Sequence, residues 1–450
     1  MNLQHVRATS AARAAGFACL AVCAVIALLA VVPAARAASG DRAWRRQVVG
    51  LNNGSAAFAA AVAAPKGGVY AAGWVFNATG DVLAARYTPG GKRSWLRPLD
   101  FSLHAYDAAE AAASDRRGDL IVAGQVDYPS ATQAEAIVKF GPSGKRQWTR
   151  YFHDTGAGQG TQVAADALGN VYVSTGTVTS DLALIKYSAS GVRRWVRRYA
   201  QPGQDQPTGL ALDSAGNVYV TGYSFSTVSQ YDVVTLKYDP AGHRRWVRRW
   251  DGTASGDDLG YGIAVTPAGA VYVAAQSTGT TTGVDAAVLK YSAAGRLLWA
   301  RLFSSAGAFD DRFDAIALLR NGDVAAAGLT SPDAIQSNVL VVRLSPSGHT
   351  HWRRAYAGPD GLSDEGRYVA GGPAGTVYVA GTSDGATTGT DMLTLKYSAA
   401  GQRNWAQRYT GAATGNDFVQ GLVVTGGGVY VAGEESGATA TIATLLKYKP

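Results

Sequence analysis

Cysteine is nearly absent from this chain, and no segment shows the 3.6-residue period of an amphipathic helix. The sequence has two cysteines in 450 residues, Cys19 and Cys23, and both lie in an N-terminal segment that we expect to be removed. The remaining chain would then have no disulfide, no thiolate metal site and no cysteine nucleophile. Without helical periodicity, its short strand-like segments predict an all-β fold.

Motifs of common hydrolases and metal enzymes are also missing. The sequence contains no Gly-x-Ser-x-Gly elbow, no His-Glu-x-x-His motif and no calcium loop of the Asp-x-Asp-x-Asp type. Asp107 with Glu110, or Asp364 with Glu365, would supply the carboxylate pair that glycoside hydrolysis needs, but local spacing does not establish such a site. The segment His349-x-His351 has metal-ligand spacing for a strand, but no third ligand is evident.

Residues 1–37 have the three parts of a secretory signal. Arg7 and Arg13 give a basic start, residues 17–32 an apolar core, and residues 35–37 a small-residue cleavage site. A membrane anchor is the alternative, but the apolar run is short for a span. We therefore expect a secreted protein, extracellular or in the periplasm or cell envelope. Its mature chain, residues 38–450, would be one domain without a stable membrane span.

Removal of the signal takes away three arginines and no acidic residue, so the formal charge falls from +8 to +5. This mild positive charge permits weak attraction to anionic envelope polymers and does not demand a nucleic-acid partner. We expect a monomer.

Eight tryptophans, 47 to 53 residues apart, mark eight copies of one unit. A period near fifty predicts a propeller, a solenoid or another array. In seven units the tryptophan follows an apolar or aromatic residue by eight positions and a glycine by four. The glycine and tryptophan pairs are Gly91/Trp95, Gly144/Trp148, Gly191/Trp195, Gly242/Trp246, Gly295/Trp299, Gly348/Trp352 and Gly401/Trp405. Trp44 starts the series without a partner, and Tyr448 ends it without one.

The content of one unit identifies the kind of array. Residues 209–213, 218–221, 232–238 and 245–250 are apolar or β-branched runs separated by turn sequences, which predicts four antiparallel strands. Four strands per unit without helices form one propeller blade. We name the strands a to d from the inside outwards. Strand a is poor in bulk because inner strands converge on the axis, and the tryptophan strand is outermost, where blades splay apart.

The two unpaired ends predict how the ring closes. The first ordered piece, residues 44–49, is a lone d strand, and the last, residues 443–448, is a lone c strand. If they pair, the N-terminal strand completes the eighth blade and removes an open edge. We predict an eight-bladed β-propeller; seven blades with a stray unit is the alternative.

These units resemble the bacterial β-propeller repeats often called SBBP repeats. The matching residues are the segment 216–222, Asp232 with residues 236–238, and Gly242-x-x-x-Trp246, and the likeness extends over about residues 44–448. The resemblance implies a propeller fold and a secreted or envelope protein. It implies no particular activity.

Length changes between units lie in the d–a and b–c connections, which emerge on the same face, and never in the c–d turn. Variable loops on one face of a repeat protein often mark its binding face. This face is acidic, and we predict that a partner contacts Asp257, Asp258, Asp310, Asp311, Asp364 and Asp417. Alternatively, these aspartates cap backbone N–H groups. We expect no cofactor, although a ring of carboxylates would suit Ca²⁺.

The outer strands are basic and aromatic. Arg197, Arg198, Arg248 and Arg249 would bind an anionic polymer such as teichoic acid or lipopolysaccharide. Alternatively, they solvate an exposed edge and stack on aromatic rings. A basic residue also repeats in strand c of all eight units, from Arg86 to Lys447. A residue present in every blade is more often architectural than catalytic.

The sequence therefore favours a binding module that recognises an extracellular or envelope protein or glycan through the variable-loop face. An enzyme at the axial mouth of that face, quinone-dependent or glycan-cleaving, is the first alternative, since Gly242-x-x-x-Trp246 shares half of the docking turn of quinoprotein dehydrogenases. A structural envelope component that uses its basic rim is the second.

Overall fold

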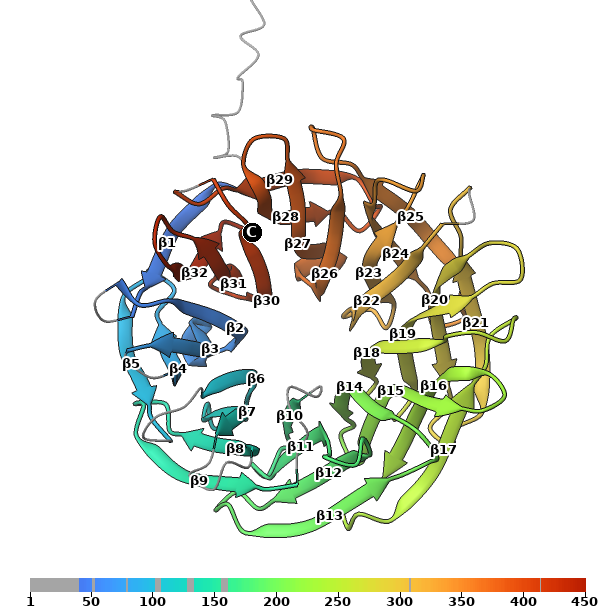
Figure 1. Ribbon diagram of the computed structural model, residues 1–450, viewed down its shortest axis with the longest axis horizontal. Helices are drawn as coiled ribbons and strands as arrows, with labels where there is room; N and C mark the ends of the chain where they lie inside the picture. The colour runs from blue at the N-terminus through green and yellow to red at the C-terminus, as the bar shows by residue number, and fades with distance from the viewer. Residues whose placement is uncertain are drawn as a thin grey trace, which may run out of the picture. The chain divides into compact units, whose positions relative to one another are not determined.

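Eight four-stranded antiparallel sheets surround a central axis in the computed structural model (Figure 1). The structure describes residues 40–50, 53–77, 80–101, 107–127, 133–154, 161–306, 309–412 and 414–450. Residues Ser39–Pro450 form one compact unit. The predicted signal, residues 1–37, lies outside the described residues. Within the described part of the chain, no helix has the length and hydropathy needed to cross a membrane.

The first four blades follow one another along the chain, each with strands a to d in sequence order. Their strands are β2 (Ala56–Ala63), β3 (Val69–Phe76), β4 (Gly80–Tyr87), β5 (Arg93–Leu99); β6 (Ala108–Ser114), β7 (Leu120–Asp127), β8 (Gln133–Phe140), β9 (Arg146–Phe152); β10 (Gln162–Ala165), β11 (Val171–Gly176), β12 (Leu182–Tyr187), β13 (Arg193–Tyr199); and β14 (Asp205–Leu212), β15 (Val218–Ser226), β16 (Gln230–Tyr238), β17 (Arg244–Trp250).

Blades five to seven have the same order, and the eighth takes its outer strand from the N-terminus. Their strands are β18 (Leu259–Val265), β19 (Val271–Thr278), β20 (Val284–Tyr291), β21 (Leu297–Phe303); β22 (Asp311–Leu318), β23 (Val324–Thr330), β24 (Asn338–Leu344), β25 (Thr350–Tyr356); β26 (Asp364–Gly371), β27 (Val377–Gly385), β28 (Gly389–Tyr397), β29 (Arg403–Tyr409); and β30 (Phe418–Thr425), β31 (Gly428–Ser436), β32 (Thr441–Tyr448), β1 (Arg42–Val48). Two single 3-10 turns, η2 (Pro65–Gly67) and η3 (Pro373–Gly375), connect strands a and b of the first and seventh blades.

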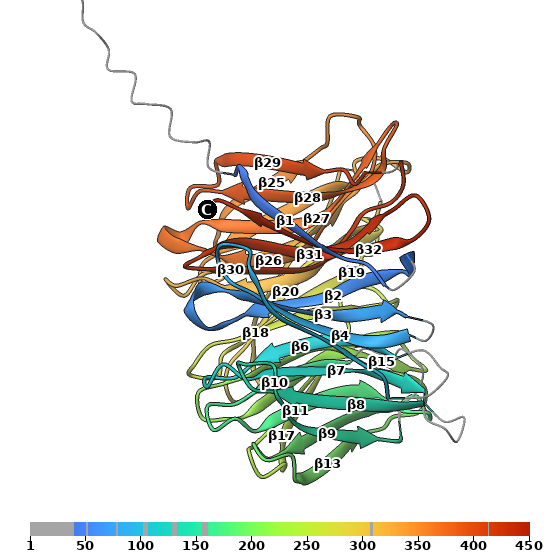
Figure 2. The ribbon, with the colours of Figure 1, turned by 90° about the vertical axis from the view of Figure 1, so that its left-hand side faces the viewer.

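The closure predicted from the two lone strands is confirmed. Strand β1 pairs antiparallel with β32, with Trp44 opposite Lys447 and Val48 opposite Ala443. Figure 2 shows the blue N-terminal strand lying beside the red C-terminal one. The ring therefore has eight blades, and no sheet contains a stray unit.

The turn between these two strands corrects the view that Trp44 has no partner. Gly40 lies four residues before Trp44, as the turn glycine does in the other blades, and has a φ of +113°. Its N–H donates to the Lys449 carbonyl at 3.1 Å, and the Lys449 N–H donates to Asp41 at 3.0 Å. In the first blade, Thr88 and Gly91 make the same two bonds at 2.9 Å. The eighth c–d turn thus exists, split between the two ends of the described chain.

The core lies between the blades. The largest fully buried side chains are tyrosines of strands b and c, such as Tyr219 and Tyr238. Alternate residues of strands b and c pack against the blade on either side, which explains why these strands read as nearly continuous apolar runs. Strand a is built of small residues near the axis, as predicted, and the tryptophans fill the wider space at the rim.

Candidate functional site

Contacts that repeat around the ring hold neighbouring blades together. At the seam after the fourth blade, Trp246 donates Nε1–H to the Ala293 carbonyl at 3.1 Å, and Lys237 donates to the same oxygen at 3.1 Å. Arg248 donates Nε–H to the carbonyl of the turn glycine, Gly295, at 2.5 Å and lies over the Trp246 ring. We call this set the seam clamp.

Seven seams have the tryptophan and arginine bonds of the clamp. The tryptophan bonds are 3.0–3.3 Å long and the arginine bonds 2.5–3.1 Å. The clamp also explains the turn glycine: Gly295 has a φ of +81°, and a Cβ there would lie 2.8 Å from the Trp246 ring. Strand-c basic residues of six blades donate to a c–d turn carbonyl of the next blade, so this position is architectural in those blades.

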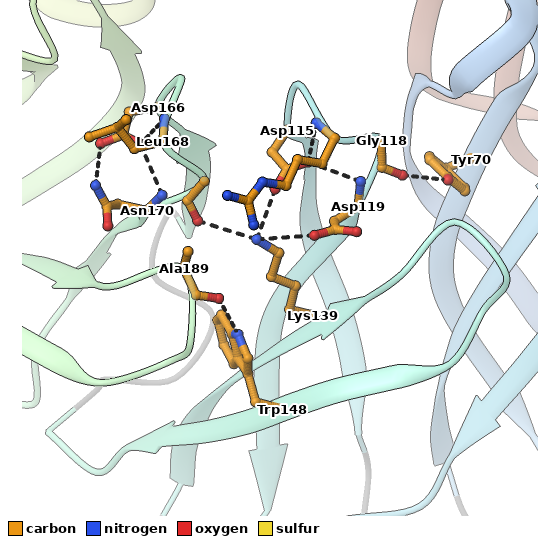
Figure 3. Close-up of polar contacts among 12 residues, drawn as sticks. Tyr70, Asp115, Gly118, Asp119, Lys139, Trp148, Asp166, Leu168, Asn170 and Ala189 are labelled. Atoms are coloured by element: carbon orange, nitrogen blue, oxygen red, sulfur yellow. Dashed lines mark hydrogen bonds and ion pairs between the residues drawn. The ribbon is translucent and has the colours of Figure 1, made fainter.

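Lys139 in the second blade makes a variant of this contact (Figure 3). Its ammonium group lies 2.8 Å from Asp115 and 3.4 Å from Asp119, and it donates to the Gly169 carbonyl of the third blade at 3.2 Å. The side chain is buried. The lysine still joins two blades, but through the a–b turn carbonyl of Gly169 in the third blade, while Trp148 alone donates to the Ala189 carbonyl.

The four predicted rim arginines are mostly engaged within the protein. Arg197 and Arg248 belong to seam clamps. Arg249 donates Nε–H to Asp232 at 2.9 Å and Nη1–H to Ser224 at 2.9 Å. Arg198 pairs with Asp154 and keeps 51% of its side chain exposed. Of the four, Arg198 alone presents most of its charge to solvent.

Four of the six predicted partner-binding aspartates lie inside the blades. Asp258, Asp311, Asp364 and Asp417 are at most 1% exposed. Each carboxylate accepts the backbone N–H of the residue six positions earlier and so closes its own d–a loop. Burial raises the pKa of Asp258 and of Asp417 to about 6, although these backbone donors favour the charged form. Their observed role is the backbone capping that the sequence offered as the alternative.

The other two predicted aspartates are more accessible. Asp310 is exposed and Asp257 is half-buried. Carboxylate oxygens of Asp232, Asp251 and Asp258 come within 4.8 Å of one another. However, Asp232 is bound by Arg249 and Ser229, and Asp258 by the Gly252 N–H, so this group is a set of structural contacts.

The histidine pair and the carboxylate pair Asp364/Glu365, considered in the sequence as candidate sites, make contacts within the protein. His351 Nε2 lies 3.3 Å from Asp323, and Asp323 also accepts from Arg343. Among the described residues, this group does not bring three ligand atoms together. Asp364 is 1% exposed and closes a loop inside its blade, whereas Glu365 pairs with Arg312 and Arg367, so both carboxylates are engaged within the protein.

The symmetry of the ring breaks at one position of the inner strand. In seven blades strand a has a β-bulge against strand b, with one unpaired residue at equivalent places. Bulges redirect a side chain and are frequent near functional sites. The bulge residues differ in every blade: Ala59, Glu110, Thr208, Tyr261, Asp314, Arg367 and Gln420.

Four charged side chains of alternating sign lie along the inner strands of the sixth and seventh blades. We call them the channel-mouth cluster: Arg312, Asp314, Glu365 and Arg367. Arg312 donates Nε–H to Asp314 at 2.8 Å and pairs with Glu365 of the next blade. Glu365 in turn accepts Nε–H from Arg367 at 2.8 Å. The Arg367 side chain is 41% exposed, and its two terminal nitrogens have no partner among the described residues. The cluster therefore has an unused guanidinium edge.

The cluster lines a cavity of about 520 Å³ in the channel, together with Thr208, Tyr261 and Tyr368. Its lining residues come from the inner strands β10, β14, β18, β22 and β26, whose places in the ring are labelled in Figure 1. Because these residues lie near the start of strand a, the cavity opens towards the variable-loop face. Burial raises the pKa of Asp314 to about 6, and one of its oxygens has no hydrogen-bond partner. A cleft with perturbed acid groups is a typical functional-site candidate.

Sequence reasoning missed Arg312, Asp314, Arg367 and Tyr261. A signal was present in six of the seven blades, where the bulge residue follows an aspartate by three positions, as Asp314 follows Asp311; in the first blade Ala59 follows Ala56. Comparing that position across units would have separated it from the uniform positions around it.

One known structure supports the fold, and two others show weaker similarity. A structure of Sqt1 from Chaetomium thermophilum is 12% identical, with a TM-score of 0.53, and the match covers 91% of this chain and 98% of that one. Polysaccharide lyase Uly1 is 11% identical (TM-score 0.46; 76% and 90% covered), and YCF48 bound to D1 peptide is 12% identical (TM-score 0.44; 82% and 96% covered). At 12% identity the likeness to Sqt1 shows the fold alone. No curated protein matches the sequence.

Fold and sequence define an eight-bladed β-propeller built from tandem repeats. Within it, the family model SBBP, a beta-propeller repeat, matches residues 194–227, which extend from β13 into β15. The chain therefore carries the SBBP repeat that its sequence resembles.

Proposed function

We propose that this protein is a secreted binding module whose ligand contacts the channel-mouth cluster on the variable-loop face. The observation that carries the proposal is the break in symmetry: clamps and loop-closing aspartates repeat around the ring, whereas Arg312, Asp314, Glu365 and Arg367 occur in two neighbouring blades only. A site that recognises one ligand needs such unequal residues.

The free edge of Arg367 favours an acidic group on the ligand. A guanidinium presents paired N–H donors that match a carboxylate, sulfate or phosphate. Arg367 Nε–H donates to Glu365 Oε2 at 2.8 Å, and this bond fixes the direction of the two terminal nitrogens in the free protein. Tyr261 and Tyr368 line the same cavity and offer flat surfaces for a sugar ring or an apolar side chain. An acidic glycan or an acidic protein loop fits this combination.

Affinity capture with residues 38–450 tests the proposal, with culture medium and solubilised envelope as the source of partners and an array of acidic and neutral glycans in parallel. The informative variant is Arg367→Gln, which removes the free donor edge. The matched control is Arg198→Gln, because Arg198 is an exposed arginine on the rim. We expect Arg367→Gln to lose the captured partner and Arg198→Gln to retain it, with unchanged circular dichroism for both.

The opposite pattern, loss with Arg198→Gln and retention with Arg367→Gln, would place binding on the basic rim. Such binding would fall steeply with salt, because exposed charges are screened within about 10 Å at 0.1 M ionic strength. Equal capture by all three proteins would reject both surfaces.

Catalysis at the same mouth is the second candidate, and Asp314 favours it. A carboxyl group with a pKa of about 6 and an unpartnered oxygen has the properties of a general acid. Turnover of a captured glycan that disappears in Asp314→Asn, with binding retained, would establish this activity.

A further inference from the structure

A buried glutamate occupies a position that is apolar in all other blades. Glu135 lies on β8, five residues before the end of strand c, and is 2% exposed. The equivalent residues are Val82, Leu182, Val233, Ala286, Val339, Met392 and Ala443, each buried in the core between blades. A carboxylate at such a position is costly unless something compensates its charge.

A second carboxyl group and two hydroxyls converge on Glu135. Thr161 Oγ1 donates to Glu135 Oε2 at 2.8 Å and lies 3.4 Å from Thr175 Oγ1. The carboxyl of Glu110, the bulge residue of β6, is also hydrogen-bonded to Thr161. Glu110 and Glu135 belong to the second blade, and Thr161 and Thr175 to the third. The four side chains therefore form one oxygen-rich pocket across a seam.

No positive charge balances this pocket among the described residues. Neither Glu110 nor Glu135 makes an ion pair with a lysine, arginine or histidine there, and Glu135 Oε1 is buried without any hydrogen-bond partner. Burial raises the pKa of both carboxyls, and the charge of Glu110 adds to the rise at Glu135. The unpartnered Glu135 Oε1 beside a second carboxyl group is a position at which a positively charged species would be stabilised.

We propose that Glu135, Glu110, Thr161 and Thr175 bind a calcium ion that joins the second and third blades. Two carboxylates and two hydroxyls give an all-oxygen donor set, which suits a hard cation. A divalent ion would neutralise both carboxylates at once. Calcium is favoured over magnesium because it accepts irregular oxygen coordination, whereas magnesium demands a near-ideal octahedron and retains its waters.

The test uses residues 38–450 after bound metal has been removed with a chelator. CaCl₂ or MgCl₂ is then added at pH 7.5, and thermal unfolding and calorimetry are measured. We expect the unfolding midpoint to rise with calcium at about 1 mM, the range in which extracellular modules bind it, and to rise less with magnesium. Calorimetry should show a single calcium ion at this pocket. The variant Glu135→Leu places the residue of the third blade, Leu182, at this position and should abolish the calcium response.

Two controls make the result specific. Glu135→Leu should unfold cooperatively and, without calcium, at a higher temperature than wild type, which shows that the variant folds. Asp251→Asn, in the other group of carboxylates, should keep the full calcium response. An equal response in wild type and Glu135→Leu would overturn the proposal.

A second result would also overturn the proposed calcium site. In it, the wild-type protein does not respond to calcium, its unfolding midpoint falls as pH rises, and Glu135→Leu abolishes that pH dependence. That outcome would mean that the two carboxyl groups share a proton. This site is independent of the channel-mouth cluster, so its failure leaves the proposed binding function untouched.

Discussion

At the scale of single residues, the seam clamp shows how one side chain serves the whole ring. Seven of the eight outer strands have an arginine two positions after the tryptophan, and each bonds the turn glycine of the next blade. In the remaining seam, Trp405 faces the split turn, Gln407 replaces the arginine, and Trp405 Nε1 has no hydrogen-bond partner among the described residues. The arginine is absent only where the turn is broken.

Arg248→Gln should therefore lower the free energy of unfolding by about 1–2 kcal/mol, because it removes a charge-assisted hydrogen bond and a cation–π contact with Trp246. Urea denaturation followed by tryptophan fluorescence measures the change. Gln407→Ala is the matched control and should stay within about 0.5 kcal/mol of wild type. Equal effects of the two substitutions would show that the clamp does not stabilise the seams.

The buried loop-closing aspartates give a pH dependence with a definite sign. The folded-state pKa of Asp417 is raised to about 6 from an ordinary value of 3.8. The folded protein then binds more protons than the unfolded chain between these values, so stability falls as pH rises from about 4 to 6. We expect a higher unfolding midpoint at pH 5 than at pH 7.5, and a smaller difference in Asp417→Asn. A midpoint that rises over this interval, unaffected by the substitution, would refute the assignment.

At the scale of elements, the split turn makes the chain a natural circular permutant of a closed ring. Both hydrogen bonds of the turn are present across the break, from Gly40 to Lys449 and from Lys449 to Asp41. The eighth sheet is therefore held by the same turn geometry as the other seven, without a covalent link. This is the structural reason that β1 adds to β32 in register.

A circular permutant tests this view. Its chain joins Pro450 to Gly40 through one residue and is opened between Ala293 and Ala294, in the equivalent turn of the fifth blade. We expect it to fold to the same propeller. The new break lies where the natural one lies in the eighth blade. Circular dichroism and the unfolding midpoint should match those of residues 38–450. Failure of this permutant to fold, with the natural order folding well, would mean that the break site matters to folding.

The outer strand of the fifth blade differs from the others in its surface. Leu297, Leu298 and Leu302 on β21 are 36–41% exposed, at positions that hold arginine in β13 and β17. Charged residues protect edge strands from pairing with other chains, and leucines do not. Changing the three leucines to arginine should reduce self-association at high concentration, measured by light scattering. An unchanged association would show that this edge is already protected, in line with the predicted monomer.

At the scale of the whole molecule, the repeats made the fold predictable. Gly295 and its counterparts recur because each c–d turn needs a residue with positive φ, and Trp299 and its counterparts recur because each seam needs a large aromatic side chain. The spacing of these residues therefore predicts the eight blades and their closure. Where one residue type recurs for one physical reason, the sequence is a reliable guide.

The candidate site was less predictable for the same reason. Asp258 and Asp417 attracted attention because they recur, yet recurrence reflects their loop-closing bonds. Asp314 and Arg367 do not recur; they are the bulge residues of neighbouring inner strands and are connected through Arg312 and Glu365. The pairing of Arg312 with Glu365 spans two blades and has no local sequence signature.

We propose that the ligand binds where the ring is unsymmetric. The most direct test is the dissociation constant of a captured partner for wild type, Arg367→Gln and Arg248→Gln, each checked for folding. The first variant alters the unsymmetric channel mouth and the second a repeated clamp. The account predicts at least a roughly tenfold weaker affinity for Arg367→Gln, about 1.4 kcal/mol, and an unchanged one for Arg248→Gln. Equal affinity of wild type and Arg367→Gln would contradict it.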